Sequence, residues 1–150
     1  MRSGQKERER KGQMKILVAV DGSKQCLKAV DSLIEHADWY RSKPEVELVT
    51  VHLPLPAVGI GKGQAQKYYQ EEGASRLVEP KKRLDAAGIR YQAQVLVGPI
   101  AETLVKHAKN AGCDLIYIGT RGLTATAGAL LGSTSTKVLN LSTTPVLLVK

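Results

Sequence analysis

Short aliphatic runs alternate with helical segments along almost the whole chain, and this alternation restricts the fold more than any other feature. The runs cover residues 16–20, 46–51, 115–118 and Val146–Val149, and they are mainly aliphatic, although residues 46–51 also include Glu47 and Thr50. Runs of this length are too short for helices and are typical of strands buried on both faces. Helices are expected between them, over residues 23–40, 64–87, 99–111 and 133–141. The pattern predicts a single α/β domain with a parallel sheet and helices on both faces.

One further strand, over residues 91–97, has a different character. Its apolar side chains alternate with other residues, which is typical of a strand with one wetter face. We therefore place it at the edge of a doubly wound open sheet of five parallel strands with the order 3-2-1-4-5. In the preceding helix we expect Pro80 to introduce a kink or an interruption.

This strand order reverses between the first and fourth strands. Ligands of open α/β sheets bind at such a reversal, beyond the carboxyl ends of the strands. The segment after the first strand begins with Asp21, and the segment after the fourth strand begins with Gly119. We therefore expect these two turns to lie side by side at one candidate site.

Glycines after the fourth strand form a pattern that favours anion binding. Gly119 and Gly122 are followed, after nine residues, by Gly132, Ser133 and Thr134 at the start of a helix. A residue without Cβ permits positive φ and close approach of backbone N–H groups to an anion, and a helix N-terminus adds partial positive charge. A lone Gly-x-x-Gly is more often a plain connection. Its place at the strand-order reversal favours a phosphate site.

With these motifs, the chain from about Met14 to Lys150 resembles the universal stress protein family. The resemblance rests on residues 16–23 (ILVAVDGS), on the strand ending at His52, on Gly98-Pro99 before a helix, on residues 114–119 and on the glycine signature. In that family the glycine signature marks the branch that binds ATP. The resemblance therefore implies adenine-nucleotide binding and a homodimer.

The resemblance also implies positions for the ligand. It places the ribose hydroxyls against Asp21 and Gly119, and the adenine near Ala19, Val20 and the backbone of Leu53. The complete set that it assigns to ATP, or alternatively to ADP or AMP, is Ala19, Val20, Asp21, Leu53, Ile118, Gly119, Arg121, Gly122, Gly132, Ser133 and Thr134. Two roles stay open: Arg121 either adds charge at the phosphates or is solvated, and Asp21 either binds ribose or only terminates its strand. Ser23 is expected to cap a helix.

Three functions fit this arrangement, and we favour a nucleotide-dependent regulatory switch in the stress response. A slow ATP hydrolase or autophosphorylating phosphotransferase, with Mg²⁺ carried by the nucleotide, is the alternative. A flavin protein fits the topology but lacks a supporting aromatic pattern. The loop at residues 59–63 is not a Walker motif, because Gly63 follows Lys62 where Ser or Thr is needed. His52 is assigned no catalytic role, and no catalytic residue is predicted.

Composition sets the remaining expectations. Residues 1–13 are charged and almost free of aliphatic side chains, so we expect a disordered extension before a domain over residues 14–150. The net charge of +8 favours anionic ligands, but the scattered basic residues match no nucleic-acid motif. The absence of a long apolar run or signal peptide indicates a cytoplasmic protein without a membrane partner. Cys26 and Cys113 are expected to be buried and reduced.

The last strand predicts the oligomer. In the expected order Val146–Val149 lies at a sheet edge, although its side chains are uniformly aliphatic. Unprotected edges of this kind pair readily with another chain. We therefore expect a homodimer through this strand, which agrees with the mode of dimerisation that the resemblance implies.

Overall fold

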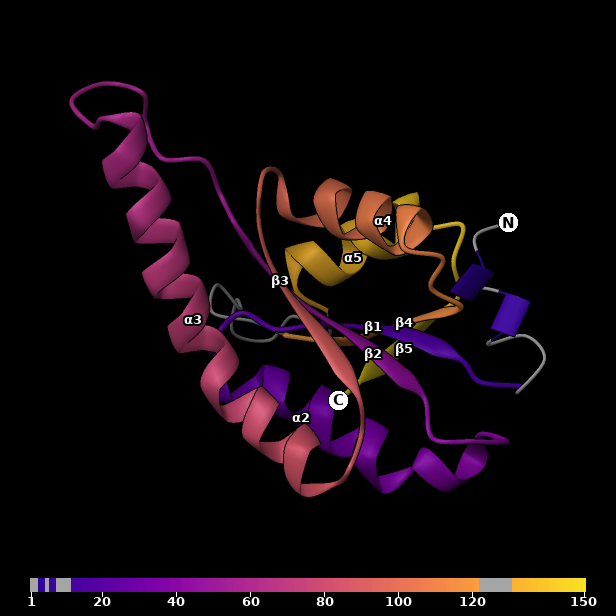
Figure 1. Cartoon of the computed structure of the whole chain (residues 1–150). Coiled ribbons are helices and arrows are strands. Elements are labelled where there is room, and N and C mark those ends of the chain that lie inside the picture. Colours follow the sequence, from indigo (N-terminus) through magenta and orange to yellow (C-terminus); the bar gives the residue numbers. More distant parts are fainter. Residues whose placement is uncertain (1–2, 5, 8–11, 122–130) are drawn as a thin grey trace.

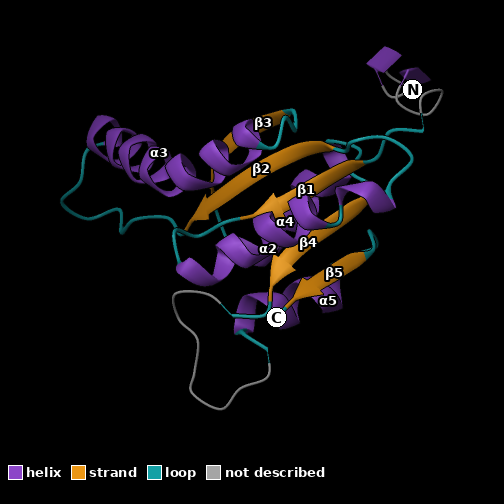
Figure 2. Ribbon diagram, turned by 90° about the horizontal axis from the view of Figure 1, so that it is seen from below, coloured by secondary structure: helices purple, strands orange, loops and turns teal. Residues whose placement is uncertain are grey.

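The computed structural model describes residues 3–4, 6–7, 12–121 and 131–150, and within them the chain forms one five-stranded sheet. The strands are β1 (Lys15–Ala19), β2 (Glu45–His52), β3 (Tyr91–Val97), β4 (Leu115–Gly119) and β5 (Val146–Val149). All neighbours are parallel, in the order β3-β2-β1-β4-β5, and Figure 2 shows the arrows running in one direction. The predicted fold and strand order are confirmed, and the bounds of β3 and β5 agree exactly.

Helices cover both faces of this sheet. They are α2 (Lys24–Glu35), α3 (Lys62–Ala86), α4 (Ile100–Asn110) and α5 (Ser133–Leu141). Helices α2 and α3 pack on one face, and α4 and α5 pack on the other (Figure 1). None of the helices in the described part of the chain has the length and apolar character that a membrane crossing needs.

The core is divided by the sheet into two layers, as alternation along the strands requires. In β1, Ile16 and Val18 point into the layer beneath α2 and α3, whereas Leu17 points into the layer beneath α4 and α5. All three side chains are fully buried. A strand that is apolar at every position therefore serves both layers, which explains why its sequence shows no alternation.

Helix α2 is shorter than its sequence pattern predicts. Ser23 caps its start as expected, and its Oγ accepts a hydrogen bond from the Cys26 amide at 3.2 Å. The helix ends at Glu35, and a separate 3-10 turn, η1 (Ala37–Trp39), follows. The side chains of Ala37 and Tyr40 still pack against the core from this turn. The expected packing of this segment against the core is therefore present, but the segment is not a continuation of the α-helix as expected.

Pro80 does not interrupt α3. The helix runs through it without a break, and Pro80 is buried on the side facing the sheet. A proline inside a helix removes one hydrogen bond to the preceding turn and crowds the carbonyl there. In α3 the packing of neighbouring Leu77 and Leu84, which are 3% and 0% exposed, holds the helix together across this point.

Gly73 of α3 lies so close to β3 that the structure leaves no room there for a larger side chain. A Cβ at this position would lie 2.5 Å from a methyl carbon of Val95 in β3, so Gly73→Val is expected to destabilise the protein by about 1–3 kcal/mol through overpacking. Urea denaturation measures the loss. Adding Val95→Ala should restore part of it.

Gly63, near the start of the same helix, provides the matched control for Gly73. A Cβ there would meet nothing within 4 Å, so Gly63→Ala should leave stability unchanged or raise it. Equal losses for both glycine substitutions would show that helix propensity, and not contact with Val95, sets the cost.

A buried cluster of charges lies near the amino ends of β1 and β2, at the rim opposite the candidate site. Glu47 of β2 is 2% exposed. One of its carboxylate oxygens lies 3.0 Å from Nζ of Lys15, and the other accepts a hydrogen bond from Nε2 of His107 in α4 at 3.0 Å. The cluster joins the first two strands to α4.

Candidate functional site

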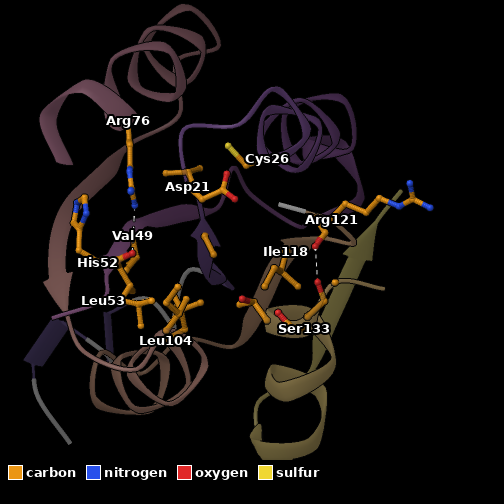
Figure 3. A pocket seen from close by; sticks show the side chains of 18 of the residues that line it. Asp21, Cys26, Val49, His52, Leu53, Arg76, Leu104, Ile118, Arg121 and Ser133 are labelled. Atoms are coloured by element: carbon orange, nitrogen blue, oxygen red, sulfur yellow. Dashed lines mark hydrogen bonds between the residues drawn. The ribbon is translucent and has the colours of Figure 1, made fainter. Parts of the chain in front are cut away.

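A pocket of about 380 Å³ opens at the carboxyl ends of β1, β2 and β4. Its wall includes ten of the eleven residues predicted from the sequence: Ala19, Val20, Asp21, Leu53, Ile118, Gly119, Arg121, Gly132, Ser133 and Thr134. The eleventh, Gly122, lies outside the described residues. The two turns predicted to meet at the strand-order reversal thus lie on one rim of the sheet, with open space between them (Figure 3).

Asp21 occupies the turn between β1 and α2. Its Oδ1 accepts hydrogen bonds from the backbone N–H of Ser23 at 2.9 Å and from the Ser23 hydroxyl at 2.6 Å. The carboxylate therefore helps to terminate the strand, as one of the two predicted roles requires. It also lines the pocket, so the structural role and a ligand contact are compatible.

A positive φ angle is found at a different glycine from the predicted ones. Gly22 has φ of 84°, a value that L-residues rarely adopt, and it lets the chain turn sharply after Asp21. By contrast, Gly132 has φ of −70°, and Gly119 is not among the positive-φ residues. Of the two properties that favour glycine at an anion site, positive φ and close backbone approach, these two residues do not use positive φ. What they contribute is a pocket wall without side chains.

The N-terminus of α5 lies at the pocket wall. Its N-cap is Gly132, which has no side chain to accept a hydrogen bond from the N–H groups of the first turn. Such N–H groups carry partial positive charge and are suited to an anion. Ser135 fixes the helix in place, because its hydroxyl donates to the carbonyl oxygen of Gly119 at 2.9 Å. Ser133 and Thr134 add hydroxyl groups at the same end.

The opposite part of the pocket is apolar. Val49 and Val51 of β2 line it from the sheet, and Ile100 and Leu104 of α4 line it from the helix layer. In Figure 3, Val49, Leu53, Leu104 and Ile118 lie around one side of the cavity. A flat, largely apolar ring is the kind of group that such a wall accommodates.

Five polar or reactive side chains line the pocket without having been predicted as site residues: Cys26, His52, Tyr68, Arg76 and Ser135. Tyr68 and Arg76 come from α3, which no sequence signal linked to the glycine turns. In the opposite sense, the side chain of Arg121 extends away from the cavity into an exposed position (Figure 3).

The cysteines are buried and reduced, as predicted. Burial is the main cause that raises the pKa of the Cys26 thiol. Its Sγ donates to the carbonyl oxygen of Ser23 at 3.0 Å. The described residues contain no group of three His, Cys, Asp or Glu side chains able to hold a metal ion.

His52 is the most unusual polar residue of the pocket. It is 4% exposed, and its Nε2 makes no hydrogen bond to any described residue. Its ring packs 5.7 Å from that of Tyr69, centroid to centroid. Burial lowers the pKa of His52, the charge of Arg76 lowers it further, and Glu72 opposes both effects.

This environment predicts a specific response to substitution. Arg76→Met removes one of the two causes that lower the pKa of His52, so that pKa should rise toward its ordinary value of about 6.5. Titration of the His52 ring signals by NMR measures the change. Arg83→Met, on the outer part of α3, serves as the control and should leave the His52 titration unaltered. Identical curves for all three proteins would contradict the electrostatic coupling.

The lowered pKa of His52 also makes the free energy of unfolding depend on pH in a definite direction. Because the folded state binds a proton on His52 less readily than the unfolded state, its contribution is present above about pH 6.5 and decreases as the pH falls through the lowered pKa. The pH dependence of unfolding between pH 7.5 and 5 should therefore be weaker in His52→Gln than in the unchanged protein.

Comparison with known proteins agrees with the geometry. The profile of the Universal stress protein family matches residues 13–150. The Universal stress protein YxiE of Bacillus subtilis is 31% identical over 149 residues, spanning 91% of this chain and 98% of that protein.

Solved structures give the same result for the fold. The structure of hypothetical protein MJ0577 superposes with a TM-score of 0.80 at 28% identity, covering 93% of this chain and 96% of that chain. A universal stress protein in complex with cAMP superposes with a TM-score of 0.66 at 29% identity, covering 93% and 98%. With its family profile, its relatives and its fold in agreement, the chain belongs to the universal stress protein family.

Proposed function

We propose that this protein binds an adenine nucleotide in the pocket between Asp21 and the N-terminus of α5, with ATP as the main ligand and ADP or AMP as alternatives. One observation carries the proposal. A single cavity of about 380 Å³ joins an apolar wall, a carboxylate and an uncapped helix N-terminus. These three environments match a base, a ribose and a phosphate in that order.

Each part of the pocket has a role in this proposal. The base packs between Val49 and Leu104, and the backbone after His52 forms hydrogen bonds with the polar edge of the base. The Asp21 carboxylate accepts hydrogen bonds from the ribose hydroxyls. The phosphates lie at Gly132, Ser133 and Thr134, where the dipole of α5 contributes about 0.3–1 kcal/mol. We further propose that Mg²⁺ is carried by the nucleotide.

A structural relative supports this choice of ligand. The relative crystallised with cAMP is 29% identical and superposes over 93% of this chain. We extend adenine-nucleotide binding from that protein to this one on the strength of the pocket lining. We further propose that occupancy acts as a regulatory switch, with hydrolysis absent or slow. ATP turnover that persists through purification and disappears in Asp21→Ala would instead support the hydrolase alternative.

Mass spectrometry of small molecules released from the freshly purified protein tests the proposal. We expect an adenine nucleotide, and calorimetry with added ATP should then show one saturable site per chain in the stripped protein. A protein that releases no nucleotide and gives no heat with ATP, ADP or AMP would overturn the assignment.

We also propose that the protein is a homodimer through β5. This strand lies at the sheet edge with half-buried aliphatic side chains, and Leu147 and Val149 pack on the layer beneath α2. A twofold partner would cover the unpaired edge. Val149→Lys should therefore give a monomer in light scattering, with a circular dichroism spectrum showing that the fold is retained. A folded Val149→Lys dimer would place the interface elsewhere.

A further inference from the structure

Helix α3 closes one side of the pocket with a cation. Arg76 reaches down from α3 toward the end of β2, and the guanidinium lies beside the cavity (Figure 3). Its aliphatic stem covers Gly22, because a Cβ at Gly22 would lie 3.0 Å from Cγ of Arg76. The side chain is thus held by packing at the turn that carries Asp21, with its charged end directed toward the cavity.

The donors of this guanidinium are largely unused by the protein. Within the described parts of the chain its one hydrogen bond runs from Nη1 to the carbonyl oxygen of Val51 at 3.4 Å. That distance is long for an N–H···O bond, and a guanidinium offers five N–H groups. Arg76 therefore has donors to spare at the pocket wall.

A second unsatisfied group lies beside it. Nε2 of His52 is buried and has no hydrogen-bond partner among the described residues, although His52 lines the same cavity. Buried polar atoms normally have a partner, and leaving one without it costs free energy. The Nε2 atom is closed off from the open cavity, so the hydrogen-bonding groups that a ligand can meet at this place are the donors of Arg76.

The position of Arg76 decides which part of a ligand it meets. Its guanidinium is beside the end of β2, whereas the α5 N-terminus follows β4, and β1 lies between these two strands. Neighbouring strands are about 4.8 Å apart, so these two ends of the pocket are separated by about 10 Å. A base or ribose packed against β2 is therefore closer to Arg76 than phosphates held at the α5 N-terminus.

We propose that Arg76 is a specificity residue that donates hydrogen bonds to acceptor atoms of the nucleoside part of the ligand. The inference rests on the proposed nucleotide site and adds a contact from α3 to it. It predicts that the contribution of Arg76 is independent of the number of phosphates. An arginine that acted on phosphate would instead contribute more to ATP than to AMP and nothing to adenosine.

The test compares Arg76→Met with the unchanged protein for ATP, AMP and adenosine by calorimetry. Methionine keeps an unbranched stem over Gly22 and removes the donors. We expect the affinity to fall about tenfold for each of the three ligands, the loss of a hydrogen bond to a charged group. Arg83→Met, on the same helix outside the pocket, controls for loss of an α3 arginine and should bind like the unchanged protein.

Ser133→Ala separates the two ends of the pocket, because it should weaken ATP and AMP but leave adenosine unaffected. Equal adenosine affinity in Arg76→Met and the unchanged protein would overturn the inference, as would a loss that grows with phosphate number. If the unchanged protein binds none of the three ligands, the proposed function itself fails, and that outcome is distinct from failure of the Arg76 assignment.

Discussion

Glu47→Gln is expected to lower the free energy of unfolding by about 3 kcal/mol, the lower end of the cost of breaking a buried ion pair. The carboxylate accepts from Lys15 on one oxygen and from His107 on the other. An amide of the same size has only one acceptor, so one of the two donors then faces another N–H group. The Lys15 side chain is 12% exposed and cannot compensate fully with water.

Thermal and urea denaturation measure this loss, which corresponds to a fall in melting temperature of about 6–12 °C. Glu79→Gln is the matched control. Glu79 pairs with Arg83 on the exposed side of α3 at 3.3 Å, and removing its charge should change stability by about 0.5 kcal/mol at most. Similar losses for the two substitutions would contradict the claim that burial gives the Glu47 cluster its importance.

Asp21→Asn should weaken ATP binding about 10- to 100-fold, since hydrogen bonds to a charged group are typically worth about 1.5–3 kcal/mol. The change retains an oxygen that can accept from the Ser23 amide, so the turn after β1 should persist. What it removes is the charge that strengthens hydrogen bonds from the ribose hydroxyls. Calorimetry with ATP measures the loss.

The opposite outcome has an equally clear meaning. If Asp21 only terminates β1, the substitution removes a negative charge from near the phosphates, and ATP affinity should stay the same or increase. Asp31→Asn, on the exposed side of α2, provides the control for a lost acidic residue and should leave ATP affinity unchanged. An unaltered affinity in Asp21→Asn would therefore reject the ribose contact.

The fold was predictable because its information is local and repeated. Strand β5, for example, is delimited by Pro145 and by its uniform aliphatic run, and the alternation in β3 placed that strand at the edge. The errors arose where tertiary packing decides. Helical spacing continues past Glu35 although the chain changes there to a 3-10 turn. Of the kink or interruption predicted at Pro80, the interruption does not occur, because α3 continues through this buried residue.

The residues of the site likewise fall into those that could be predicted from the sequence and those that depend on tertiary packing. Asp21 and Gly119 were predictable because strand order alone brings the ends of β1 and β4 together. Arg76 and Tyr68 were not, because their place at the pocket depends on how α3, a helix of 25 residues, crosses the end of β2. No periodicity in the sequence specifies that crossing. The unpartnered Nε2 of His52 is likewise a property of packing and is invisible in the sequence.

Amide chemical-shift mapping with ATP tests the central claim most directly, because it reports where the nucleotide lies. We expect saturating ATP to shift the backbone amide signals of Asp21, Leu53, Gly119 and Ser133, which line the pocket. The amide signals of the Glu47 cluster, at the opposite rim of the sheet, should keep their chemical shifts. ATP binding that shifts the amide signals at the opposite rim, or that leaves the signals of Gly119 and Ser133 unchanged, would contradict the proposed nucleotide site.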